Sequence, residues 1–260
     1  MLEYISGQGR FLVAPRNING MPGPMIWQGD APSFEMMMEE DVYERKENYT
    51  GMRALAVRRT KEMKCNLSAT LVQMDEDVAA LLTRGEVITQ AVTPIVDEPI
   101  THSAELPPLG AFLMLGAFDV SAVTIKDSTS GSPKTLEQDV NYILDAKGGT
   151  IEIVDLTENG PFVGPFTASY TPAAVKAIKL LSAAEREYWV RFLGVNTAAE
   201  GNPRMVGDWY RVRWSPTTGF GFIQEETGEF PIEGGALADP TKKPDSNLGQ
   251  FGRMFLEKRV

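Results

Sequence analysis

The sequence has little of what catalytic and metal sites are built from. Among its 260 residues there is one cysteine, Cys65, and one histidine, His102. One residue of each type cannot supply a common zinc site, and a Ser-His-Asp or Cys-His triad would have to use His102. We expect His102, in a Thr-His-Ser loop, to be an exposed loop residue. Cys65 cannot form an internal disulfide and is expected to be a small buried hydrophobic residue.

Cofactor-binding loops and a nucleophile elbow are also missing. The chain has no Gly-x-Ser-x-Gly segment and no Gly-Lys-Ser or Gly-Lys-Thr. Gly7-Gln8-Gly9 begins a dinucleotide-loop pattern, but neither a preceding strand nor a following helix is evident. We therefore expect no enzyme activity, no cofactor and no metal.

Basic charge and long apolar runs are scarce as well. The chain has 25 Lys and Arg against 35 Asp and Glu, a net charge of −10. This argues against a surface that grips nucleic acid, which would be basic, although an acidic surface lets nucleic acid pass without binding. No apolar run approaches the roughly 18 residues that a membrane helix needs, and the start, MLEYISGQGR, lacks the apolar core of a signal peptide. We expect a soluble chain, made in the cytoplasm, with no membrane partner.

The segment from Ser33 to Val72 organises what is present. From Lys64 to Val72 apolar and polar residues alternate, which predicts a half-buried strand. The first half, Phe34 to Arg45, starts apolar and ends charged, and predicts a second long strand. Strands usually run about five or six residues. A pair this long is either a hairpin on a monomeric β domain or part of a sheet that other copies complete.

Two charged groups lie in this segment. We predict a basic connection between the strands, mobile before assembly because its charges lack partners in the monomer. Its basic residues are Arg45, Lys46, Arg53, Arg58, Arg59 and Lys61. The first strand carries Glu39-Glu40-Asp41, of which only Glu39 and Asp41 share a face, so a solvated or channel-lining acidic strip is a better interpretation than a cation site.

The rest of the chain predicts one helix among many strands. Asp75 to Arg84 has an N-cap, acidic residues in its first turn and Gly85 placed to end it. Ala111 to Leu115 predicts a buried strand. Phe118 to Thr171 holds four short strand candidates separated by turn chemistry. We interpret it as an inserted small β module, residues 118–171, in a main β domain of residues 1–117 and 172–260; the alternative is that it continues the main sheet.

The C-terminal half predicts further strands. Asp208 to Trp214 alternates, with Tyr210, Val212 and Trp214 on one face and two arginines, solvated or paired with carboxylates of a neighbouring strand, on the other. Gly219 to Gly235 predicts a Gly-punctuated strand pair. Ser182 to Glu185 fits a capping box, which predicts a short helical turn.

Several segments, in their order, resemble one known family. They are IWQGDAPSFEM, the carboxylate-rich strand ending ERKENYTG, LLSAAEREYWVRFLGVNTAAEGNP, WYRVRWSP, EGGALADPTK and the final FGRM. Together they resemble the major tail tube proteins of long-tailed (siphovirus-type) bacteriophages with non-contractile tails. The resemblance covers nearly the whole chain, and none of its segments is a catalytic signature.

The resemblance implies a fold class and partners. The fold would be mainly β, a tail-tube-type β-sandwich or barrel subunit with one short flanking helix and an inserted all-β module on the tube exterior. Six copies would close into a ring whose strands form one continuous barrel without free edges. Rings would stack around the tape-measure protein, between a tail-tip initiator and a tail terminator, and DNA would later pass through without specific binding. The protein would be assembled in the host cytoplasm and end in the virion tail.

Within such a tube, the charged residues suggest which surfaces form contacts and which line the channel. The basic connection would meet an acidic surface on the next ring or subunit, and Glu35, Glu39 and Asp41 are candidates for the lumen. The alternative function is a monomeric all-β binding module, for example one that binds carbohydrate through a platform of Trp27, Trp189, Trp209 or Trp214.

Overall fold

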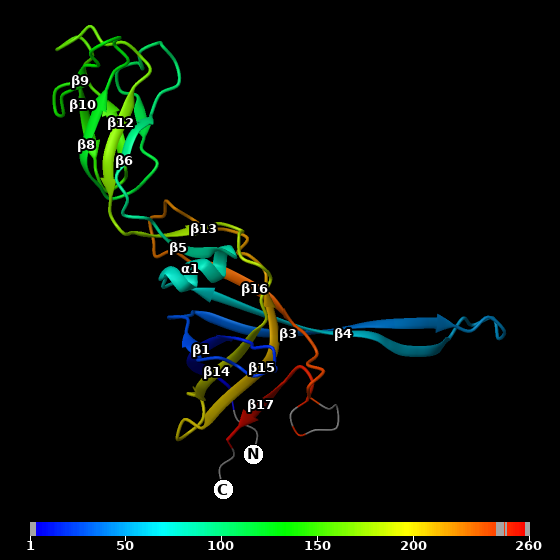
Figure 1. The fold of residues 1–260 in the computed structure, drawn as a ribbon. Coiled ribbons are helices and arrows are strands. Elements are labelled where there is room, and N and C mark those ends of the chain that lie inside the picture. Colours follow the sequence, from blue (N-terminus) through cyan, green and yellow to red (C-terminus); the bar gives the residue numbers. More distant parts are fainter. Residues whose placement is uncertain (1–3, 243–246, 248, 258–260) are drawn as a thin grey trace. The chain divides into compact units, whose positions relative to one another are not determined.

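The chain folds as two compact β units. The computed structural model describes residues 4–242, 247 and 249–257. Unit 1 comprises Met1–Glu86 and Ile178–Val260, and unit 2 comprises Val87–Ala177. The protein is mainly β, as predicted, with a single α-helix in the described part of the chain (Figure 1).

Unit 1 is built on one antiparallel sheet. Its order is β2-β1-β14-β15-β16-β4-β3. The eighth strand, β17, pairs with β15 at Met205–Trp209, whereas β16 pairs with β15 at Val212–Trp214. The strands are β1 (Gly7–Pro15), β2 (Ile26–Trp27), β3 (Ser33–Lys46), β4 (Leu55–Leu71), β14 (Tyr188–Asn196), β15 (Arg204–Trp214), β16 (Phe230–Ala236) and β17 (Gly252–Leu256). Segments from both ends of the chain thus lie side by side in this sheet.

The sheet curls around its apolar face. Phe11 of β1 and Phe34 of β3 come from strands near opposite ends of the sheet, yet their rings stack with centroids 4.8 Å apart. The predicted alternation in β4 is confirmed, because its odd-numbered residues from Cys65 to Leu71 are buried in this core. The other buried members are Phe11, Val13, Val78, Leu82, Val190, Trp209, Val212, Trp214, Ile232 and Ala236.

The predicted helix is α1 (Glu76–Thr83), and it packs Val78 and Leu82 on the core. Asp75 is its N-cap and accepts a hydrogen bond from the backbone N–H of Val78 at 2.8 Å. The predicted role of Gly85 is corrected: Arg84 takes the left-handed conformation (φ 49°), and the Gly85 N–H closes the last turn on Ala80 O at 2.8 Å. A left-handed residue satisfies carbonyls that the helix end leaves free.

The sequence predicts Tyr210 on the same face as Val212 and Trp214. This prediction is wrong, because β15 carries a bulge. Tyr188 pairs with Val212 and Val190 with Trp209, so β15 has one more residue than β14 between these pairs. An extra residue reverses the alternation beyond it. Trp209 and Val212 therefore both face the core, while Tyr210 packs edge-on against Trp189 with ring centroids 4.8 Å apart.

The sequence predicts that the two arginines of β15 are solvated or paired with carboxylates of a neighbouring strand. Both bind Glu187, which immediately precedes β14. Its Oε1 accepts hydrogen bonds from Arg211 Nη2 at 2.7 Å and Arg213 Nη2 at 3.2 Å. The Arg211 hydrogen bond, opposed by partial burial, holds the pKa of Glu187 below its usual range. These contacts fix the segment before β14 to the polar face of the sheet.

Unit 2 packs two small sheets on one core. Their orders are β10-β11-β7 and β6-β12-β8-β9, and residues such as Ile125, Ile151 and Phe166 are fully buried in the core. The strands are β6 (Ile95–Pro99), β7 (Phe112–Met114), β8 (Val120–Lys126), β9 (Thr135–Leu136), β10 (Tyr142–Asp145), β11 (Thr150–Ile153) and β12 (Thr167–Pro172). Two further strands, β5 (Glu86–Thr89) and β13 (Lys176–Lys179), pair with each other where the chain passes between the units.

The boundaries of the inserted unit differ from those predicted. It begins at Val87 rather than Phe118 and ends at Ala177 rather than Thr171. The reason is long-range pairing, since β6 and β7 join β12 and β11. The predicted burial of the β7 strand is also wrong: as the edge strand of its sheet it leaves Phe112 and Met114 68% and 75% exposed.

Two local predictions in the C-terminal half are wrong as well. Residues 182–185 form no helical turn. Of the predicted strand pair in Gly219 to Gly235, only β16 is a strand, and residues 215–229 form an irregular loop between β15 and β16. Local capping and turn signals do not suffice where no apolar periodicity supports an element.

Candidate functional site

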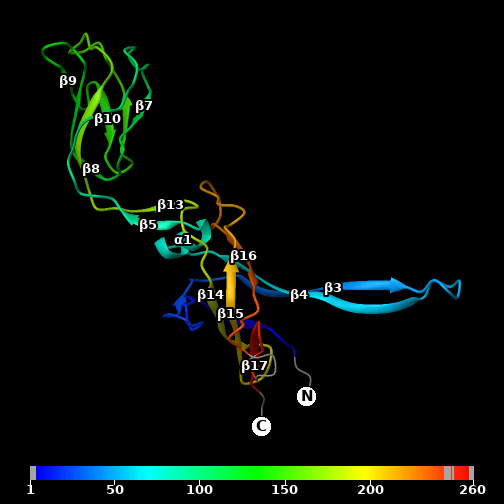
Figure 2. The ribbon, with the colours of Figure 1, turned by 45° about the vertical axis from the view of Figure 1, so that its right-hand side comes forward.

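The long hairpin β3–β4 outgrows the sheet that carries it. β16 pairs with β4 from Leu71 to Cys65 only. Beyond this point Glu39–Lys46 and Leu55–Lys64 pair with each other alone, and we call this part the ribbon. It extends roughly 25 Å at about 3.3 Å per residue, and Figures 1 and 2 both show it leaving the rest of unit 1. Most of the predicted basic connection is therefore strand.

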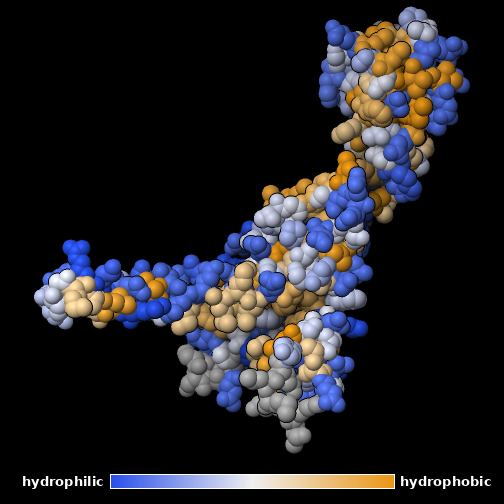
Figure 3. All heavy atoms as spheres, turned by 180° about the vertical axis from the view of Figure 1, so that it is seen from behind, coloured by the Kyte–Doolittle hydropathy of each residue, from blue (hydrophilic) through white to orange (hydrophobic). Residues whose placement is uncertain are grey.

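The ribbon is exposed on both faces. All its residues except Val42 are exposed, among them Tyr43, Leu55, Val57 and Met63. Figure 3 shows a largely hydrophilic ribbon with apolar atoms among the polar ones towards its tip. A two-stranded ribbon on its own is marginal in water at best. Its free edges and apolar side chains are what a further strand or subunit would cover.

Several ribbon charges have partners within the hairpin, contrary to the prediction. Arg58 lies opposite Glu44 with Nε–Oε1 at 3.8 Å, and Lys61 reaches Asp41 at 3.7 Å. The Arg59 guanidinium lies 5.1 Å from the ring centroid of Tyr43. Exposed pairs of this kind contribute about 0–1 kcal/mol each. Their effect is chiefly to favour this cross-strand register.

The remaining candidate cations gather near the tip. Arg45, Lys46 and Arg53 are exposed, and none forms an ion pair with any residue that the structure describes. Arg58, Arg59 and Lys61 lie further down β4, towards the sheet. The six predicted basic residues thus lie on one hairpin. Arg58 and Lys61 form ion pairs within it and Arg59 contacts the Tyr43 ring, whereas Arg45, Lys46 and Arg53 have neither kind of contact in the described part of the chain.

Glu47 organises the turn of the hairpin. Its carboxylate accepts hydrogen bonds from the Thr50 hydroxyl and from the backbone N–H groups of Thr50, Tyr49 and Ala54, the latter two at 2.8 and 3.3 Å. The Thr50 hydroxyl and amide, followed by the Tyr49 amide, lower the pKa of Glu47 to about 2. The tip is thus held in one shape, with Tyr49 and Met52 86% and 83% exposed.

The three predicted lumen carboxylates lie on one face. Glu35 pairs with Ser68, Glu39 with Lys64 and Asp41 with Glu62, while Phe34 and Met36, on either side of Glu35, turn to the core. Directly opposed residues share a side of the sheet. Glu35, Glu39 and Asp41 therefore form a polar row with β4 on the side opposite the core.

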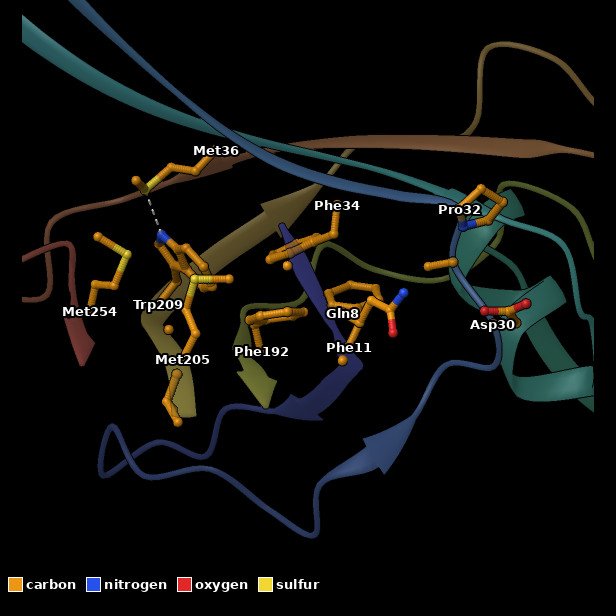
Figure 4. A pocket seen from close by; sticks show the side chains of 15 residues that line it. Gln8, Phe11, Asp30, Pro32, Phe34, Met36, Phe192, Met205, Trp209 and Met254 are labelled. Carbon is orange, nitrogen blue, oxygen red and sulfur yellow. Dashed lines mark hydrogen bonds between the residues drawn. The ribbon is translucent and has the colours of Figure 1, made fainter. Parts of the chain in front are cut away.

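An aromatic groove opens between the two ends of the curled sheet. It has a volume of about 840 Å³. One side is lined by Gly7, Gln8, Gly9 and Phe11 of β1, and the other by Asp30, Ala31 and Pro32 before β3 and by Phe34 and Met36 in it. Phe34 is central: its ring lies 5.3 Å from Trp209 and 6.0 Å from Phe192 (Figure 4). Trp209 Nε1 donates to Met36 Sδ at 3.3 Å. The sequence analysis missed this groove, because it depends on which strands meet across the curl.

A second, smaller groove of about 500 Å³ adjoins it at the base of the ribbon. Its walls include Met36, Met38, Met63 and Met254, beside Cys65. Burial raises the pKa of the Cys65 thiol, which disfavours the reactive thiolate. Cys65 is buried, as expected.

The alternative sugar platform finds little support. Trp189, Trp209 and Trp214 are each 8–9% exposed, and Trp209 and Trp214 belong to the core. Trp27 is half exposed, with Arg10 placed 5.4 Å from its ring centroid. Two of the four tryptophans lie in the core, Trp189 packs against Tyr210, and only Trp27 is exposed, so together they do not form a flat binding surface.

The structure adds an apolar and acidic loop that sequence reasoning did not single out. Phe222 and Ile223 are 89% and 98% exposed at its tip. Three exposed glutamates, Glu225, Glu226 and Glu229, follow, and none has an ion pair within the described part of the chain. The signal in the sequence was the apolar run GFGFI followed by EETGE, which lies in the segment predicted as a Gly-punctuated strand pair.

The described residues contain neither a cluster of metal ligands nor a membrane-spanning helix. No three or more His, Cys, Asp or Glu side chains lie where they could hold a metal ion. No helix in the described ranges is long and apolar enough to cross a membrane.

Comparison with known proteins places the chain in a family. The fold and the surfaces above define a mainly β protein with a curled sheet, an exposed ribbon and a β insertion. The chain belongs to the family described as "Protein of unknown function UCP028589", which matches residues 4–255. No curated protein matches it.

Proposed function

We propose that this protein is a structural subunit that assembles with copies of itself into stacked rings, forming the tail tube of a long-tailed bacteriophage. The observation that carries the proposal is the ribbon: paired strands that run past the sheet and expose apolar side chains on both faces. A ribbon that contributes nothing to its own core has a physical reason to exist only if another molecule covers it.

The curled sheet supports the same proposal. Between β1 and β3 it stays open over an aromatic groove, and the sheet ends at β2 and β3, so a strand from another copy has free edges to pair with. The resemblance of the sequence to tail tube proteins supplies the particular assembly: six copies a ring, with the tape-measure protein inside during assembly and the tail-tip initiator and terminator at the ends. The subunit is not an enzyme, and DNA passes it without specific binding.

The charge of the described surfaces agrees with a conduit. The row of Glu35, Glu39 and Asp41 would line the lumen, where carboxylates repel phosphate. In this proposal the protein is made in the host cytoplasm and ends in the virion tail, with unit 2 on the tube exterior.

The first test is electron microscopy with light scattering on the purified chain, with tail-tip and tape-measure partners added if it remains monomeric. Hollow tubes or rings are the expected result. A chain that stays near 28.6 kDa even with these partners contradicts the proposal.

A ribbon deletion sharpens this test. Glu40 and Met63 are directly opposed, so Asp41 to Glu62 can be replaced by Asn-Gly, which favours a tight two-residue hairpin turn. The shortened chain should keep its thermal unfolding midpoint and lose assembly. Tubes at normal yield from this variant would exclude the ribbon as an assembly element.

A further inference from the structure

Two exposed surfaces of unit 1 complement each other. The first, the hairpin tip, joins Tyr49 and Met52 to the unpaired cations Arg45, Lys46 and Arg53. The second, the acidic loop, joins Phe222 and Ile223 to the carboxylates Glu225, Glu226 and Glu229. Each combines strongly exposed apolar side chains with exposed charges of one sign, and the two signs are opposite; the Glu47 carboxylate of the turn is buried.

The two surfaces cannot meet within one copy. The tip lies at the far end of the paired ribbon, whereas the acidic loop joins β15 to β16 in the body of the sheet. They are well separated in both Figure 1 and Figure 2. Because β3 and β4 pair along the whole hairpin, the ribbon has no unpaired segment about which to fold back.

We propose that the hairpin tip of one copy docks on the acidic loop of a second copy. Tyr49 and Met52 would pack against Phe222 and Ile223, while the three cations lie against the three glutamates. Apolar anchors ringed by complementary charge are the usual anatomy of a protein interface. The inference rests on the proposed self-assembly and names the surfaces that carry it.

The contact has a direction. It joins two different patches, so it is heterologous, and repeating it gives a closed ring or an open filament rather than a twofold dimer. The preformed tip supports it, since the hydrogen bonds of Glu47 hold the turn before any partner arrives. A preorganised loop loses less entropy on binding.

Charge reversal on each side tests the contact. The tip variant is R45E/K46E/R53E, and the loop variant is E225K/E226K/E229K. Each alone should lower polymer yield about tenfold or more, because like charges then face each other across the interface. The two sets combined in one chain should restore assembly. Assembly of both single-side variants at the wild-type level would overturn the proposal and leave the tube function standing.

A matched control removes net charge as an explanation. K179E/R186E/R204E reverses the same number of exposed cations of unit 1 away from the tip. It should assemble at the wild-type level. A loss equal to that of the tip variant would mean that net charge, not this contact, governs assembly, and would also overturn the proposal.

Disulfide trapping tests the contact even in a solution without tubes. Chains carrying M52C and I223C are mixed at high concentration and oxidised; Cys65 is buried and adds little background. A cross-linked dimer should form in the mixture, and not when M52C is mixed with I18C, although Ile18 is fully exposed. Equal cross-linking with I18C, or none with I223C, would overturn the proposal. If the wild-type chain never forms tubes but M52C and I223C still cross-link, the result contradicts the tube proposal and leaves the tip–loop contact standing.

Discussion

Phe11 and Phe34 stack face to face with ring centroids 4.8 Å apart, although β1 and β3 lie near opposite ends of the sheet order. No backbone pairing joins the two strands, so side-chain packing closes this part of the curl. Aromatic pairs contribute about 0.5–1.5 kcal/mol beyond the area they bury. The stacked pair is thus a measurable link between the edges of the aromatic groove.

A double-mutant cycle should detect this link. Phe11→Leu and Phe34→Leu each lower the free energy of unfolding, and their coupling should be about 0.5–1.5 kcal/mol. Denaturant unfolding of the four proteins measures it. Phe11→Leu with Val190→Ala, a core residue of the neighbouring strand β14, provides a comparison pair. A coupling near zero for Phe11 and Phe34 would show that the rings do not stack in solution.

Asp208 should stabilise the fold through its two arginines. Its carboxylate accepts hydrogen bonds from Arg191 Nε at 2.5 Å and Arg253 Nε at 3.1 Å, which ties β17 to β15. Asp208 is 2% exposed whereas both arginines reach solvent, so Asp208→Asn should cost about 1–3 kcal/mol. Arg253→Gln, which removes only the more exposed partner, should cost less than about 1 kcal/mol. Urea unfolding at pH 7 distinguishes the two.

The same carboxylate predicts a pH dependence. Burial opposes its ionisation, but Arg191 and then Arg253 outweigh burial and lower the pKa of Asp208. A group whose pKa is depressed on folding stabilises the protein above the unfolded pKa of about 3.9. This contribution should be lost as pH falls below that value through the folded pKa. The unfolding free energies of wild type and Asp208→Asn should therefore converge on acidification; a constant difference would contradict the assignment.

Glu47→Gln should loosen the tip without unfolding the protein. Glutamine cannot accept the same set of hydrogen bonds, and the tip lies outside both cores. Trypsin should cut after Arg53 several-fold faster, while the thermal unfolding midpoint stays unchanged. Glu44→Gln, on the ribbon but outside the turn, is the control. In wild type the Glu47 carboxyl should titrate near pH 2 by NMR, so the turn keeps its order above about pH 4 and loses it as pH falls towards 2.

Removing unit 2 at its structural boundaries should leave unit 1 folded. Gln90 N–H donates to Val175 O at 2.8 Å, so residues 91–174 can be replaced by a two-residue turn. Deleting 118–171 instead would leave β6 and β7 without partners and should give an aggregating product. Circular dichroism and size-exclusion chromatography compare the two. Equal behaviour of both deletions would contradict the boundaries described above.

Sequence reasoning predicted an element correctly where a single local signal, such as a helix cap or an alternating pattern, specifies that element. The cap at Asp75 and the alternation from Cys65 to Leu71 each identified an element that the structure contains. It predicted the β3 half of the ribbon as strand but missed the β4 half, Leu55 to Met63, because a strand exposed on both faces has no apolar period to detect. It failed on Tyr210 because a bulge is set by the pairing with β14, which no local pattern records.

The sequence by itself determined the mainly β class, the single helix, the scarcity of catalytic side chains and the acidic charge. These follow from composition and short-range periodicity. Only the tertiary structure decided which strands meet: that β6 and β7 belong to unit 2, that β1 and β3 leave an aromatic groove between them, and that the tip and the acidic loop stay uncovered. The physical reason is that burial and edge pairing are properties of residues far apart in the chain, fixed only when the sheet curls on its core.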